Sequence, residues 1–145
     1  MKLKKFSIEE ANKIITKIKI LFDEIFVLKK KSSFIADEMK WIRDFWGNDL
    51  YDKDNADADR YKQFGQDVNI NSRRIYQTLK KIEKFGCIVN DVNGGLVDFY
   101  SEIKRRKIFL CWQYGEASIK YWHSADVGIH ERRPVTEIEK IIEKK

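Results

Sequence analysis

The sequence predicts an α+β fold, in which a long antiparallel helical hairpin or three-helix bundle precedes a small antiparallel β-sheet and a short C-terminal helix. Up to about residue 86, apolar residues recur at three- and four-residue spacing, which is typical of helices that bury one face. Beyond Gly86 the pattern changes to short apolar runs separated by turn residues, which indicates hairpins. We expect one domain over residues 1–145, with helices in 1–86, a β-meander in 87–135 and a helix in 136–145.

Two helices are expected in the first third of the chain. A capping box begins the first at Ser7, since the Ser7 hydroxyl can accept the amide of Glu10. It ends near Lys29–Lys31, where cations favour the negative end of the helix dipole. The second covers about Ser33 to Trp46. Its broad stripe predicts burial on more than one side, and it includes Phe34, Trp41 and Phe45.

A third long helix is predicted from about Ala56 to Phe85. It carries a heptad-like seam of Tyr61, Val68, Ile75 and Ile82. The acidic segment before it, residues 49–59, lacks the glycine and terminal glutamate of a calcium-binding loop, so we interpret it as a solvated linker.

Four strands are predicted after Gly86, and a tight turn at Asn93-Gly94-Gly95 joins the first two. A charged bend at Lys104–Arg106 joins the second and third. The third is apolar on both faces, which predicts the central position in the sheet. The strands are Cys87–Val92, Leu96–Tyr100, Lys107–Trp112 and Ile119–His123.

Three segments of the C-terminal half carry specific motifs: Gly95–Phe99, Leu110–Glu116 and Trp122–Ile129, followed by Arg132 and Pro134. With these motifs, and with an opening helix at Phe6–Asn12, the chain resembles an uncharacterised prokaryotic family, domain of unknown function 2203. The resemblance implies no activity, because the family has none assigned.

Polar groups in these motifs lie at strand ends, so we expect them to converge on a shared pocket. The catalytic candidates are His123, Glu116, Asp126 and Asp98, and the ligand-binding candidates are Trp112, Trp122, Arg132 and Cys111. His123 is expected to bond to Glu116 or Asp126 before Asp98, with a tryptophan against the pair and Arg132 favouring an anionic substrate. The alternative is structural: a hydrogen-bonded core histidine, and a Glu116 that pairs with Arg132.

We expect no metal site and no cofactor. His123, Asp126 and His130 offer suitable ligand atoms, but their spacing matches no established zinc pattern. A nucleophilic pair of Cys111 and His123 is disfavoured, because a thiol in an apolar strand has a raised pKa. Both cysteines, Cys87 and Cys111, are expected to be buried free thiols.

The net charge is +6, and the basic residues concentrate at both ends of the helical part. A basic surface can attract RNA, and the candidate contacts are Arg73, Arg74, Lys80, Lys81, Lys84, Lys104, Arg105 and Arg106. No apolar run approaches the roughly 20 residues of a membrane helix, and we expect a cytoplasmic protein.

Three functions remain open from the sequence. The first is a non-catalytic binding or scaffold protein, with a protein partner or a homo-oligomer formed through the helices. The second is an RNA- or ribonucleoprotein-associated factor. The third is a small enzyme or anionic-ligand-binding protein that uses the His, carboxylate and Arg groups of the sheet.

Overall fold

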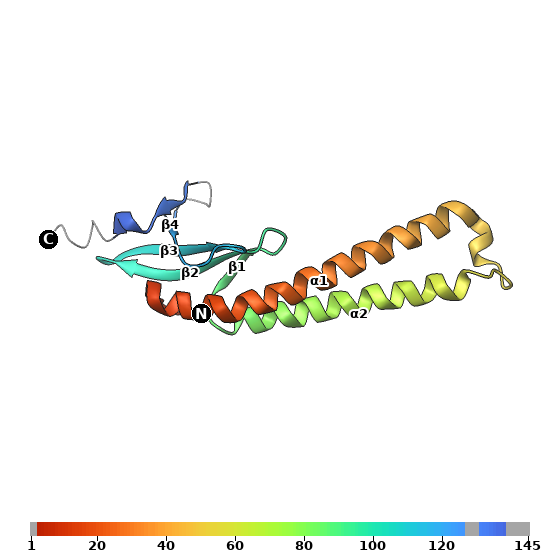
Figure 1. Ribbon diagram of the computed structural model, residues 1–145, viewed down its shortest axis with the longest axis horizontal. Coiled ribbons are helices and arrows are strands. Elements are labelled where there is room, and N and C mark those ends of the chain that lie inside the picture. Colours follow the sequence, from red (N-terminus) through yellow and green to blue (C-terminus); the bar gives the residue numbers. More distant parts are fainter. Residues whose placement is uncertain (1–2, 127–130, 139–145) are drawn as a thin grey trace. The chain divides into compact units, whose positions relative to one another are not determined.

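The computed structural model describes residues 3–126 and 131–138. The chain forms two compact units, one made of residues 1–22 and 79–145 and the other of residues 23–78. The predicted α+β fold is confirmed, with two long helices followed by a five-stranded antiparallel sheet in the order β1-β2-β3-β4-β5 (Figure 1). The elements are α1 (Ile8–Trp46), a 3-10 helix η1 (Gly47–Tyr51), α2 (Ala58–Glu83), β1 (Ile88–Asp91), β2 (Leu96–Ile103), β3 (Arg106–Gln113), β4 (Tyr121–Ser124) and β5 (Arg133–Pro134).

Helix α1 is continuous over 39 residues, so the separate helix predicted from Ser33 to Trp46 is wrong. No glycine or proline occurs within α1, and a serine costs a helix only a few tenths of a kcal/mol, so Ser32 and Ser33 do not interrupt it. The predicted start is confirmed, since the Glu10 amide donates to Ser7 Oγ at 3.0 Å. The helical part is therefore a hairpin of α1 and α2.

The sheet contains the four predicted strands with shifted ends, and a fifth strand that the sequence did not predict. The central position of β3 is confirmed, because it pairs with β2 on one side and β4 on the other. The predicted charged bend is a two-residue turn in which Lys104 and Arg105 both have positive φ, at 49° and 66°. At the C-terminus, residues 136–138 are helical, and the rest of the predicted helix lies outside the described residues.

The two faces of the sheet have different surroundings in the first unit. One face packs on the N-terminal segment and the start of α1, where the Phe6 and Phe99 rings lie 5.1 Å apart and the Phe22 and Trp112 rings 5.9 Å apart. Side chains alternate along a strand, so the neighbours of these core residues point to the opposite face. Asp98, beside Phe99 on β2, is one of them.

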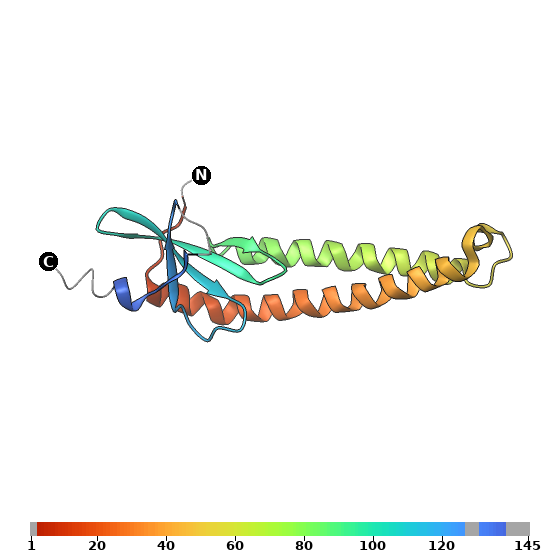
Figure 2. The same cartoon turned by 90° about the horizontal axis from the view of Figure 1, so that it is seen from above.

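In the second unit, the segments of α1 and α2 run antiparallel beside each other, as two perpendicular views agree (Figures 1 and 2). At their connection the Trp46 indole donates to an Asp57 carboxylate oxygen at 2.8 Å. The unit has a thin core, whose buried hydrophobic residues are Ile25, Ile42 and Leu50. Among the described residues, no helix has the length and apolar character needed to span a membrane.

Candidate functional site

A buried polar cluster lies on the face of the sheet that points away from α1. Strand pairing places Asp98 of β2 opposite Cys111 of β3, and Phe109 of β3 opposite His123 of β4. Asp98, Cys111 and His123 therefore share one face, and their ligand-type atoms all lie within 4.8 Å of one another. The side chains of His123 and Asp98 are only 5% and 9% exposed, so little of the cluster's polar surface is in contact with solvent.

The His123 ring has a partner at each nitrogen. Its Nδ1 lies 3.0 Å from the backbone carbonyl oxygen of Ser124, and its Nε2 lies 3.1 Å from Asp98 Oδ1. A carbonyl only accepts, so the proton of the first bond must reside on Nδ1. The second nitrogen then faces a carboxylate oxygen, and that contact requires a shared proton or another cation. The second carboxylate oxygen of Asp98 accepts from Asn90 Nδ2 at 3.1 Å.

Cys111 is fully buried beside this pair. Burial raises the pKa of its thiol to about 12, and the nearby Asp98 carboxylate acts in the same direction. A catalytic Cys–His–Asp triad needs one imidazole nitrogen on the acid and the other on the thiol. Here the other nitrogen of His123 faces the Ser124 carbonyl, so this geometry is not that of an activated nucleophile.

Arg132 borders the cluster, but its charge is already paired. Its Nη2 donates to Glu116 Oε1 at 2.6 Å, and its guanidinium stacks on the Tyr121 ring with 4.1 Å between the guanidinium carbon and the ring centroid. Glu116 also accepts from the Gln113 amide at 2.6 Å, which fixes the carboxylate in place. The alternative in which Glu116 pairs with Arg132 therefore agrees with the observed geometry. Arg132 does not face an open anion site.

The prediction that His123 pairs with a carboxylate is confirmed, but the expected order of partners is wrong. His123 bonds to Asp98, which was expected after Glu116 and Asp126, since Glu116 is held by Arg132. Asp126 is exposed, and a hydrogen bond from the Ser124 hydroxyl lowers the pKa of its carboxyl group.

The prediction that a tryptophan packs against His123 and its carboxylate is also wrong. Trp112 follows Cys111 and Trp122 precedes His123, so strand alternation turns both indoles to the opposite face of the sheet. Trp112 packs there against Phe22, and its Nε1 donates to the Glu116 carbonyl at 2.8 Å. The ring that does lie beside His123 is Phe109, at 5.5 Å between centroids.

Sequence reasoning missed the residues that complete the cluster's surroundings: Asn90, Phe109, Tyr121 and Ser124. Phe109 and Tyr121 follow from alternation, since each lies two residues from a cluster member on its own strand. Asn90 carries no such signal, because its contact with Asp98 depends on the pairing of β1 with β2. His130 lies outside the described residues.

The predicted nucleic-acid contacts are all exposed but lie in two different segments of the chain. Arg73, Arg74, Lys80 and Lys81 lie on α2, and Lys84 directly follows it. Lys104 and Arg105 form the β2–β3 turn, and Arg106 begins β3. Lys80 pairs with Glu83 on its own helix at 3.3 Å.

A second candidate site is an apolar surface on the helices of the second unit. Large hydrophobic side chains stand exposed on α1 at seven-residue spacing, with Val27 54%, Phe34 67% and Trp41 67% exposed. Phe45, four residues after Trp41, is stacked on it with ring centroids 5.7 Å apart. The prediction that Phe34, Trp41 and Phe45 are buried on more than one side is wrong, because no helix among the described residues covers them. We call these four residues, Val27, Phe34, Trp41 and Phe45, the α1 outer face.

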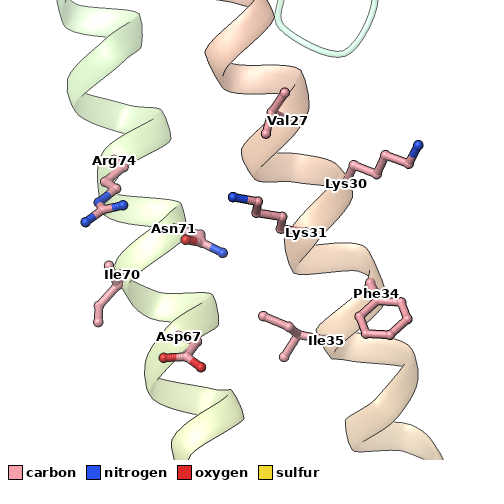
Figure 3. A pocket seen from close by; sticks show the side chains of 9 residues that line it. All are labelled: Val27, Lys30, Lys31, Phe34, Ile35, Asp67, Ile70, Asn71 and Arg74. Atoms are coloured by element: carbon pink, nitrogen blue, oxygen red, sulfur yellow. The ribbon is translucent and has the colours of Figure 1, made fainter.

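A groove of about 780 Å³ adjoins the α1 outer face between α1 and α2. Val27 and Phe34 line it from α1, and Ile70 and Arg74 line it from α2 (Figure 3). Ile70 is itself 44% exposed, so apolar surface continues across the groove onto the second helix.

The family model described as "Uncharacterized conserved protein (DUF2203)" matches residues 4–135, so the chain belongs to this family and the resemblance is confirmed. The matched range includes both candidate sites. No curated protein and no solved structure matches the chain.

Proposed function

We propose that this protein is a non-catalytic binding protein that pairs with a second copy of itself through the α1 outer face. The observation that supports the proposal is the exposure of large apolar side chains in a unit with a thin core. Contiguous apolar surface of this kind on a water-soluble helix marks an interaction site. The catalytic alternative lacks a comparable observation, since the polar cluster is largely buried and its imidazole is occupied at both nitrogens.

The spacing of the α1 outer face suits another helix. A seven-residue step falls only about 20° short of two full turns, so residues 27, 34 and 41 form a nearly straight stripe. Residue 45 lies eleven residues from Phe34 and returns to the same stripe. A straight stripe of large side chains is the surface that helices use in two-stranded pairing.

The charges beside the stripe select an antiparallel pair. By helical spacing, Lys30 and Asp37 lie on one flank of Phe34, and Lys31 and Glu38 lie on the other. In an antiparallel pair centred on Phe34, each flank meets the same flank of the other helix. Lys30 then meets Asp37 of the partner subunit, and Lys31 meets Glu38 of the partner subunit, so every contact joins opposite charges.

Parallel pairing reverses this outcome. It would bring each flank against the opposite flank of the other helix, so that Lys30 meets Lys31 of the partner subunit and Asp37 meets Glu38 of the partner subunit. Like charges at these positions disfavour the parallel arrangement. The stripe is thus self-complementary in one orientation, as a two-fold symmetric homodimer requires.

The expected interface is small. Each of the four side chains exposes roughly 100 Å², so two copies hide about 800 Å² of apolar side-chain surface. With the flanking residues, the total approaches the lower end of the range for specific interfaces, roughly 1,200 Å². We expect a dimer that dissociates at concentrations on the order of micromolar.

Sedimentation velocity of the full chain over a concentration series tests the proposal. The wild type should shift from monomer to dimer, and Phe34→Asp should weaken association at least tenfold, because a charge at the centre of the stripe is desolvated on pairing. Tyr76→Asp is the matched control, since Tyr76 is also an exposed aromatic, at 60%, and helical spacing places it on the side of α2 opposite Arg74. It should associate like the wild type.

Charge exchange tests the orientation. Lys30→Glu and Asp37→Lys should each weaken self-association, and an equimolar mixture of the two variants should associate again. A wild type that stays monomeric to millimolar concentration would refute the proposal. A monomer that instead binds structured RNA with steep salt dependence would support the RNA prediction in its place.

A further inference from the structure

The cluster of Asp98, Cys111 and His123 contains one oxygen, one sulfur and one nitrogen ligand at close range in a buried position. These are the residue types that bind zinc and related transition metals in proteins. They come from three neighbouring strands of one sheet, so the backbone pairing that holds them together is rigid. The sequence expectation considered His123 with Asp126 and His130, and it expected no metal; the structure groups His123 with different residues.

We propose that Asp98, Cys111 and His123 form a binding site for a divalent transition metal, with Zn²⁺ as the ion that suits the ligand set best. The three residues supply three ligands, and a fourth position is left for water or a small exogenous ligand. This site lies in the sheet and is independent of the α1 outer face.

The orientation of His123 supports metal binding. A metal-bound histidine commonly donates its other ring N–H to a carbonyl or carboxylate, which fixes the tautomer that leaves the coordinating nitrogen unprotonated. His123 Nδ1 is held in this way by the Ser124 carbonyl at 3.0 Å. Its Nε2 then faces Asp98 Oδ1 at 3.1 Å, and a metal ion can take the place of the proton that this contact otherwise needs.

The second carboxylate oxygen of Asp98 is also supported. Asn90 Nδ2 donates to it at 3.1 Å, which orients the carboxylate so that Oδ1 faces the imidazole. Ligating carboxylates are commonly held by such outer hydrogen bonds. Two of the three ligands therefore already have the partners that a metal site needs around it.

The spacing fits after a small adjustment. Bond lengths of about 2.0–2.3 Å place tetrahedral zinc ligands roughly 3.3–3.7 Å apart. The observed nitrogen–oxygen distance is 3.1 Å, and no pair of ligand atoms exceeds 4.8 Å. Side-chain movement of about 1 Å at most closes the set around an ion.

Charge also balances. The Asp98 carboxylate and a Cys111 thiolate together neutralise a divalent cation, and His123 binds as the neutral imidazole. Arg132 next to Cys111 is neutralised separately by Glu116 at 2.6 Å. A bound divalent ion therefore leaves no uncompensated charge in this buried region, as burial of charge requires.

Cobalt(II) titration of the metal-stripped, reduced full-length protein tests the proposal. Coordination by the thiolate should produce a sulfur-to-cobalt charge-transfer band that saturates at one equivalent per chain. Cys111→Ser should abolish this band. Cys87→Ser should retain it, because Cys87 is the other buried thiol and its Sγ contacts the Ile82 carbonyl at 3.3 Å instead.

A zinc competition assay with a chromogenic chelator gives a second readout that does not need the thiol. Asp98→Asn preserves the shape of the side chain, and we expect it to weaken zinc binding at least tenfold while Glu102→Gln on the same strand leaves it unchanged. Circular dichroism establishes that each variant is folded. The proposal would be overturned if the wild type showed no cobalt band and bound zinc no more tightly than the Cys111→Ser protein does. It would also be overturned if the cobalt band persisted in the Cys111→Ser protein.

Discussion

Removing the Asp98 carboxylate should strongly destabilise the first unit, which contains the sheet and is called the sheet unit below, even without metal. Without metal, a proton must lie between His123 Nε2 and Asp98 Oδ1, so Asp98→Ala removes the acceptor of both His123 Nε2 and Asn90 Nδ2, each at 3.1 Å. Asn90 is exposed and can bond to water instead, but the His123 side chain is only 5% exposed and its Nε2 keeps no partner. Hydrogen bonds to a charged group contribute about 1.5–3 kcal/mol each, and breaking a buried charged pair on one side costs about 3–5 kcal/mol. We expect a loss of about 3–5 kcal/mol in the free energy of unfolding.

Urea denaturation in the presence of a chelator measures this loss. A Trp41→Phe, Trp46→Phe background leaves Trp112 and Trp122 as the fluorescent reporters, and both lie in the sheet unit. The matched control is Glu102→Ala on the same strand, whose carboxylate pairs with exposed Lys5 at 2.9 Å and accepts from the Tyr100 hydroxyl at 2.7 Å.

The control should lose far less stability, since solvent screens an exposed pair. The double variant Asp98→Ala, His123→Ala removes both members of the pair. Its loss in the free energy of unfolding should therefore be smaller than the summed losses of the two single variants by more than about 1 kcal/mol. A loss below about 1 kcal/mol for Asp98→Ala, or additivity in the double variant, would refute the reasoning that this pair is desolvated and coupled.

Two further predictions concern single sites in the sheet unit. Burial raises the pKa of Cys87 from 9.0 to about 12, so at pH 8 iodoacetamide should modify Cys87 about a thousandfold more slowly in the native protein than in the denatured chain. The rate in the native protein should rise tenfold per pH unit. Mass spectrometry of the Cys87 peptide measures the modification, and equal rates in the two states would contradict the burial. The turn residues Lys104 and Arg105 have φ of 49° and 66°, a conformation that Asn and Gly adopt more easily. Replacing the two residues by Asn-Gly should therefore raise the free energy of unfolding, measured by urea denaturation, by about 1 kcal/mol. A lower free energy of unfolding would show that the native side chains stabilise the turn.

The convergence of Asp98 with Cys111 depends on a register that the sequence does not specify. The two-residue turn pairs Ile103 with Arg106, and counting outward along the hairpin then places Asp98 opposite Cys111. Such turns favour Asn and Gly, because both central residues need positive φ. Lysine and arginine do not indicate a two-residue turn, so the sequence predicts a bend here but not its length. Without that length the register of the hairpin is open, and the carboxylate that pairs with His123 cannot be identified.

The orientation of the tryptophans was, by contrast, available from the sequence. Each predicted strand fixes the faces of its residues by alternation, and two neighbours cannot share a face. Trp112 beside Cys111 and Trp122 beside His123 therefore had to face the other side of the sheet. The predicted strands thus already place both indoles on the face opposite the polar cluster.

Helix α1 carries two apolar stripes in its second half, and a two-helix hairpin explains only one. Ile42 is buried, and Met39 approaches α2 so closely that its Cε lies 3.7 Å from the position of a Cβ on Gly65. This stripe recurs at three- and four-residue intervals, as packing on α2 requires. Phe34 and Trp41 belong to the other stripe, at seven-residue spacing, and both are 67% exposed. Periodicity alone shows that both stripes are apolar but not what covers each. An aromatic stripe that the described part of the chain leaves uncovered is the physical reason to look for the second copy.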